Sequence, residues 1–142
     1  MLCYNQSVVS TKILRGDINT KLYEDFEKWL NSVFEKDIPN DVAALNFNIY
    51  EDTNSYWSIE VIGASSFDED NDDWACDEVT DFQTIDNQFS WKEEADWEDI
   101  LAKIVELLHK YLEVGYYSNK IRKVNGIGTG FVDGDIELVY VK

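Results

Sequence analysis

Apolar residues recur at helical spacing in two stretches of the chain, and polar residues fill the positions between them. The first stretch covers residues 20–36, with apolar positions at Leu22, Phe26, Trp29, Leu30 and Val33. The second follows Asp96 and stops before Gly115, with apolar positions at Trp97, Ile100, Leu101, Ile104, Leu108, Tyr111 and Leu112. A stripe of this period is typical of an amphipathic helix. The pattern therefore predicts two helices, each with one face that must pack against a sheet.

A shorter, alternating pattern marks the strands. In residues 42–50 and 56–62 every second residue is apolar, and the polar residues 51–55 between them form a turn. This alternation predicts an antiparallel hairpin with one face toward the solvent. We expect a third strand at residues 74–79, after an acidic loop. Near the end of the chain, Asp133-Gly134 lies between two β-rich runs and predicts a tight hairpin.

The order of these elements predicts an α+β fold. Strands come in runs and do not alternate strictly with helices, which favours a mostly antiparallel sheet of about five strands with both amphipathic helices packed on one side. The length of 142 residues is close to that of one domain, and no repeat or linker divides it, so residues 1–142 are expected to form a single domain. Its 44% hydrophobic and 14% aromatic residues supply a core despite a net charge of −17.

Cysteine content and hydropathy indicate a cytoplasmic protein. Cys3 and Cys76 are too few for a disulfide scaffold and have no zinc-ligand spacing, so we expect reduced thiols, with Cys76 packed beside Trp74. The first residues lack the pattern of a secretory signal, and no apolar run approaches the length of a membrane span.

Negative charge is concentrated in one part of the chain. Residues 37–91 contain 14 of the 29 carboxylates and no lysine or arginine. The densest part lies in residues 65–86, called here the acidic segment, and Trp74 is embedded in it. A strong negative potential repels nucleic acids and anionic membranes and accelerates encounter with cationic proteins. The charge therefore indicates a basic protein partner, with no direct binding of nucleic acid or membrane.

Several motifs have the residues of a chemical site but lack its context. Gly126, Gly128 and Gly130 precede a strand and a turn where a phosphate loop needs a helix, so we interpret them as positions of close packing or a bulge. Asp68-x-Asp70-x-Asp72 resembles the start of a calcium loop, but Asp73 and Val79 occupy the positions of its glycine and glutamate, which leaves only weak divalent-cation binding. His109 is the single histidine. We therefore expect no enzyme activity, no cofactor and no dedicated metal site.

The acidic segment remains as the candidate site. A single charged run usually serves only solubility, but an embedded tryptophan and the absence of compensating bases favour a binding surface. The predicted partner-binding residues are Asp68, Asp70, Asp72, Asp73, Trp74, Asp77, Glu78 and Asp81.

With this layout, the chain resembles the small acidic immunity proteins of bacterial polymorphic toxin and contact-dependent inhibition systems. The resemblance rests on the single α+β domain, on DEDNDDWACDEVTDF at residues 68–82 and on GIGTGFVDGDIELVY at residues 126–140. It implies a non-catalytic inhibitor that binds a cognate toxin domain, often a basic nuclease, and blocks its active site or an adjacent surface. On this hypothesis the carboxylates pair with toxin lysines and arginines, and Trp74 is the apolar anchor.

Two other functions fit the same features. A DNA mimic would use spaced carboxylates in place of phosphates to inhibit a DNA-binding protein, and it would displace DNA from unrelated basic proteins. A general protein-binding module would tolerate neutralisation of the acidic segment. The sequence indicates no particular oligomeric state.

Overall fold

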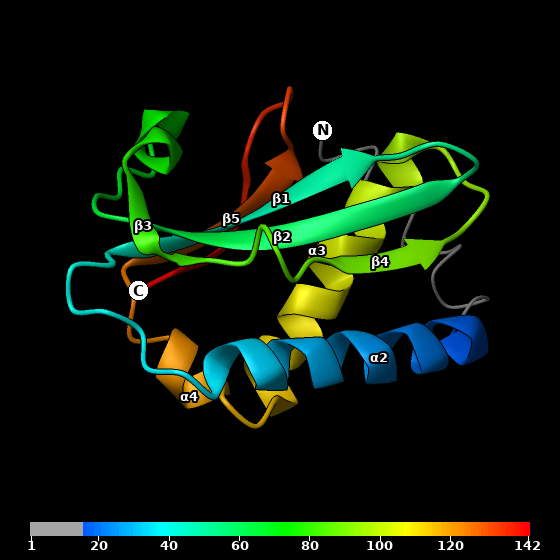
Figure 1. The fold of residues 1–142 in the computed structure, drawn as a ribbon, viewed down its shortest axis with the longest axis horizontal. Coiled ribbons are helices and arrows are strands. Elements are labelled where there is room, and N and C mark those ends of the chain that lie inside the picture. The colour runs from blue at the N-terminus through cyan, green and yellow to red at the C-terminus, as the bar shows by residue number, and fades with distance from the viewer. Residues whose placement is uncertain (1–15) are drawn as a thin grey trace.

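A computed structural model describes the backbone of residues 16–142 and the side chains of residues 20–142, so Cys3 lies outside the described residues. Along the chain, consecutive strands are grouped between the helices (Figure 1). Their bounds are α2 Gly16–Phe34, β1 Ala44–Glu51, β2 Tyr56–Ala64, the 3-10 helix η1 Asp72–Cys76, β3 Glu78–Gln83, β4 Phe89–Lys92, α3 Trp97–Val114, α4 Ser118–Ile121, β5 Gly126–Phe131 and β6 Glu137–Val141.

The strands form one six-stranded sheet in the order β3-β2-β1-β5-β6. β3 and β4 share one edge of β2, where β4 pairs with Tyr56 to Ile59 and β3 pairs with Ile62 to Ala64. Every pair is antiparallel except the central pair of β1 and β5, which is parallel. The predicted α+β fold with a mostly antiparallel sheet is confirmed, with six strands in place of about five.

Both long helices cover the same face of the sheet, as the apolar stripes predict. In Figure 1, α2 lies below the sheet, α3 runs diagonally behind it, and η1 rises above its left end. The core between helices and sheet contains side chains with no exposed surface, such as Phe26, Leu30 and Ile104 from the helices and Phe47 and Ile59 from the strands. The opposite face of the sheet is called here the second face. Part of it is covered by η1, which belongs to the acidic segment.

The predicted third strand is present, but its predicted bounds, residues 74–79, are wrong for residues 74–77. The chain forms η1 there, because the Asn71 side chain accepts a hydrogen bond from the Asp73 N–H at 2.9 Å and starts a helical turn. The strand follows as β3 from Glu78. Cys76 is exposed and not packed in a core.

The short elements β4 and α4 were not predicted, because four residues carry too little periodicity.

The terminal hairpin is confirmed, but its connection is longer than a tight turn. β5 and β6 are antiparallel, and residues 132–136 connect them. The Gly134 N–H donates to the Phe131 carbonyl at 2.8 Å, and no glycine of the described chain has a positive φ. A two-residue Asp-Gly hairpin turn would need a positive φ, which Gly134 does not have. The connection is therefore longer, and it folds back over the second face.

Two glycines of β5 allow this close approach. A Cβ atom at Gly126 would lie 2.1 Å from the Phe67 ring, and one at Gly128 would lie 2.5 Å from Cγ2 of Ile136. Both side chains therefore pack directly on the backbone of β5. The interpretation of these glycines as positions of close packing is confirmed.

Candidate protein-binding surface

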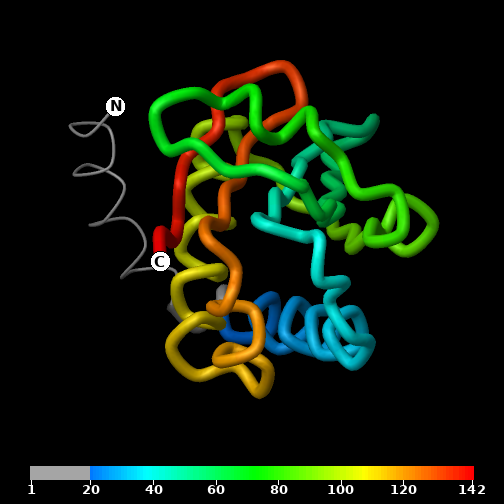
Figure 2. Tube along the Cα trace, turned by 90° about the vertical axis from the view of Figure 1, so that its left-hand side faces the viewer, coloured from blue at the N-terminus to red at the C-terminus, as the bar shows by residue number. Residues whose placement is uncertain are grey.

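The acidic segment packs on the second face of the sheet through η1 and then continues as the edge strand β3, and its carboxylates point outward. Figure 2 shows this green stretch at the top of the molecule, opposite the blue helix α2. All seven of its predicted carboxylate residues are exposed, namely Asp68, Asp70, Asp72, Asp73, Asp77, Glu78 and Asp81. The structure therefore exposes all seven from the residues before η1 to β3, and Asp81 also lines a depression with Val33 of α2 and the neighbouring Lys36.

Trp74 points in the opposite direction. Its side chain is 3% exposed and packs in a small second core with Ala44 and Ala64. Its ring meets that of Phe67 edge-on at a centroid distance of 5.3 Å. The prediction that Trp74 is an apolar anchor for a partner is wrong, because this tryptophan holds the acidic segment to its own sheet.

Polar bonds fix the same segment further. The Asp72 carboxylate accepts a hydrogen bond from the Ile136 N–H at 3.0 Å and joins η1 to the connection before β6. Asp68 accepts from the Asp70 N–H at 2.9 Å, and Asp77 accepts from the Ser66 hydroxyl at 2.6 Å. The segment is thus ordered by its own chain, without a partner.

The remaining carboxylates carry uncompensated charge. In the described part of the chain, the side chains of Asp70, Asp73, Glu78 and Asp81 take part in no hydrogen bond or ion pair, and each of the three ion pairs there lies outside the acidic segment. Nor do three or more metal-ligating side chains converge among these residues. The surface can therefore attract cationic groups by its field.

A second feature, which the sequence did not reveal, is an open hollow of about 1010 Å³ at the end of β1. Its apolar part includes Trp97 and Val132, each 50% exposed. We call it the β1-end hollow, and its lining is Ile49, Tyr50, Glu51, Asp52, Thr53, Trp97, Phe131, Val132, Asp133 and Gly134. Helical periodicity placed Trp97 in the apolar stripe, but the first residue of α3 lies at the rim of the core.

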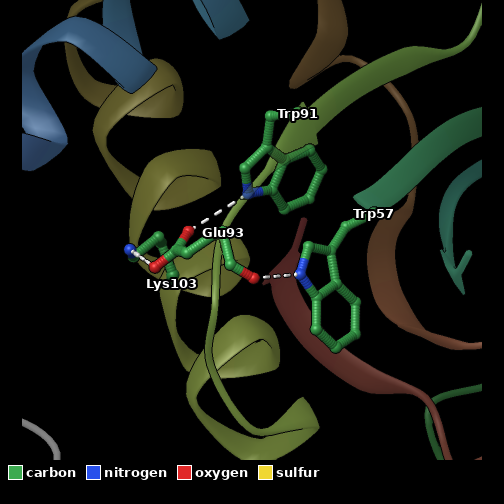
Figure 3. A network of polar contacts seen from close by, with 4 residues as sticks. All are labelled: Trp57, Trp91, Glu93 and Lys103. Atoms are coloured by element: carbon green, nitrogen blue, oxygen red, sulfur yellow. Dashed lines mark hydrogen bonds and ion pairs between the residues drawn. The ribbon is translucent and has the colours of Figure 1, made fainter. Parts of the chain in front are cut away.

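Aromatic contacts hold Trp97 in place. Its ring meets Phe131 edge-on at 6.0 Å, and Phe131 in turn meets Trp57 at 6.0 Å. The indole N–H of Trp57 donates to the Glu93 carbonyl at 2.8 Å (Figure 3). Trp97 is therefore held on one side by its contact with Phe131, while half of the side chain stays exposed.

The connection into α3 is fixed by the Glu93 side chain. Its carboxylate pairs with Lys103, which is 3% exposed, and accepts from the Trp91 indole N–H at 3.1 Å (Figure 3). A buried lysine needs such a partner, because an unpaired charge is costly to bury. These bonds fix the four residues before Trp97.

A polar network lies on the second face beside the hollow. Asn46 donates to Asn48, and the Glu60 carboxylate accepts from Asn48 at 3.0 Å and from the Tyr50 hydroxyl at 2.7 Å. Burial raises the pKa of Tyr50 to about 12, and the hydrogen bond to Glu60 adds to this effect. Glu60 is 4% exposed and its second carboxylate oxygen has no protein partner. Because Tyr50 also lines the hollow, the network is joined to it.

Comparisons with protein-family models, curated proteins and solved structures give no match. The chemistry of these surfaces is therefore the basis of the proposed function. Among the described residues, none of the helices has the length and apolar character that crossing a membrane requires.

Proposed function

We propose that this chain is a non-catalytic inhibitor that binds a basic protein, and that it acts in the cytoplasm as an immunity protein against a cognate bacterial toxin domain. The observation that carries the proposal is the exposed, uncompensated charge of Asp70, Asp73, Glu78 and Asp81 on an ordered segment. A toxin that grips phosphates, such as a nuclease, is electropositive at its active site. A preordered carboxylate surface can occupy that field and lose little entropy on binding.

The continuity of the acidic surface supports the proposal. Asp72 is bonded to Ile136, and the connection that contains Ile136 also supplies Asp133 to the β1-end hollow. Carboxylates are thus exposed from η1 to the end of β1 over one side of the molecule. One partner can cover both regions.

Co-expression tests the proposal. The chain is produced together with the C-terminal domain of any large secreted protein that is encoded beside it, and survival and co-purification are measured. We expect survival and a stable one-to-one complex. Death of the cells without a complex would contradict the immunity role, and displacement of DNA from unrelated basic proteins would favour the DNA mimic.

Charge reversal then locates the binding surface. Changing Asp70, Asp73, Glu78 and Asp81 together to lysine should slow association by about 10-fold or more at low salt and flatten its salt dependence. The matched control reverses four exposed acids outside the acidic segment, namely Glu24, Glu35, Glu94 and Glu113. Equal association rates for the two variants would remove the acidic segment from the interface.

A further inference from the structure

The β1-end hollow combines an exposed aromatic surface with carboxylates. Trp97 and Val132 supply the exposed apolar surface, and Glu51, Asp52 and Asp133 are exposed acids around it. No lysine, arginine or histidine of the described chain lines it. An apolar surface with only negative charge at its edge is complementary to a cation that also has a flat or apolar part.

The acids of the hollow are held by a rigid hairpin. The Asp52 side chain accepts a hydrogen bond from the Ser58 hydroxyl, and the Asp52 N–H donates to the Tyr56 carbonyl at 2.9 Å. Asn54 and Ser55, the central residues of the turn, have φ of 59° and 62°. Positive φ is strained for serine, and such strain persists only where the surrounding structure imposes it. The position of Asp52 in the lining of the hollow, which Trp97 shares, is therefore preorganised.

We propose that the hollow binds an arginine side chain from a basic protein partner. The guanidinium group stacks on the exposed face of Trp97 and forms hydrogen bonds with a carboxylate of the rim. Arginine fits this combination better than lysine, because its planar group stacks on aromatic rings and meets a carboxylate with two parallel bonds. Trp97, and not the buried Trp74, then supplies the tryptophan anchor of the interface.

This inference rests on the proposed function for the identity of the partner, but the hollow can be tested without the toxin. The probe is a capped Gly-Arg-Gly peptide, titrated to millimolar concentration into the full-length chain and followed by ¹H–¹⁵N NMR. Capped Gly-Lys-Gly and the neutral isostere Gly-citrulline-Gly are the controls. The Trp97 indole signal is assigned from its loss in Trp97→Phe.

We expect the arginine peptide to shift the signals of Trp97, Thr53 and Val132, with weaker shifts for lysine and none for citrulline. Trp97→Ala should reduce the affinity by about 10-fold. If that variant does not fold, the double variant Glu51→Gln and Asp133→Asn must give the same reduction. Shifts spread over the acidic segment, equal shifts with citrulline, or no shift in the hollow overturn the proposal.

A partner from co-expression separates the two proposals. Trp97→Ala should then weaken the complex by about 10-fold, while Tyr116→Ala, at a tyrosine that is 80% exposed and outside the hollow, should leave it unchanged. A complex that is insensitive to Trp97→Ala overturns the role of the hollow and leaves the inhibitor function standing. If the arginine peptide binds in the hollow but co-expression yields no toxin partner, the inhibitor function is overturned and the arginine site remains.

Discussion

Tyr50 and Glu60 form the central pair of the network on the second face. The Tyr50 hydroxyl donates to a carboxylate that is almost fully buried, so the neutral form of the tyrosine is favoured in the folded chain. Its pKa is raised from 10.0 to about 12, first by burial and then by Glu60. A raised pKa means that the folded state holds this proton more tightly than the unfolded state does.

This shift predicts an alkaline loss of stability. The contribution of the Tyr50 hydroxyl is fully present below pH 10 and is lost as the pH rises through about 12. The advantage of the natural chain over Tyr50→Phe in free energy of unfolding should therefore shrink across this range, as measured by urea unfolding. Tyr23 and Tyr111, whose pKa values burial also raises, are present in both chains and cancel in the comparison. A constant difference would contradict the assignment.

Trp74 and Trp97 show why residue type alone did not identify the exposed tryptophan. Trp74 lies among nine carboxylates in residues 67–86, yet it is buried, whereas Trp97 lies at a helix start and is half exposed. Trp74 is buried because Gly128 on a distant strand leaves room for its ring, 3.3 Å from the position of a Cβ atom. No pattern near residue 74 contains that information.

Among the elements, the junction of β4 and α3 depends on one buried ion pair. Lys103 is 3% exposed and Glu93 is 22% exposed. Water therefore cannot solvate the lysine charge if the Glu93 carboxylate is removed. The pair links the segment after β4 to the second turn of α3 and indirectly positions Trp97. Asp99 lies four residues before Lys103 on the same helix, but Lys103 forms its ion pair with Glu93.

The difference in burial predicts unequal effects of removing each partner. Glu93→Gln leaves a buried, unpaired lysine and should cost about 3 kcal/mol, whereas Lys103→Met removes the buried charge and should cost less, because Glu93 still reaches solvent. Urea unfolding of both variants measures this. The exposed pair Lys21 and Asp25 is the control, where Lys21→Met should leave the stability almost unchanged, because solvent screens this pair. Equal costs at the two ends of the buried pair would contradict the argument.

At the scale of the whole molecule, the net charge of −17 opposes folding through repulsion between carboxylates. Few ion pairs offset it, since the described chain has three. Salt screens such repulsion over about 10 Å at 0.1 M. The charge that we propose attracts a basic partner therefore also destabilises the chain when it is alone.

This repulsion predicts that sodium chloride stabilises the chain. The midpoint of urea unfolding should rise between low salt and about 0.5 M, where screening is strong. The variant with Asp70, Asp73, Glu78 and Asp81 changed to lysine has a formal charge of −9, because each change adds two charges, and it should respond less. A cooperative unfolding transition of this variant would also show that any loss of protection is not caused by unfolding. An equal salt response of both chains would contradict the role of repulsion.

The sequence by itself determined the elements whose signal is local. The stripe of α3, with its end before Gly115, and the alternation in β1 and β2 depend only on neighbouring residues, and so does the acidity of the segment. The α+β class followed from their order.

Only the tertiary structure decided which faces are exposed. It placed β5 parallel to β1, which put Gly126 and Gly128 opposite Phe67 and Trp74, and it brought Trp97 beside Phe131 and Asp52. These contacts join residues far apart in the chain, and burial depends on such partners and not on local periodicity. For that reason the acidity of the segment was predictable from the sequence, while the burial of Trp74 and the exposure of Trp97 were not.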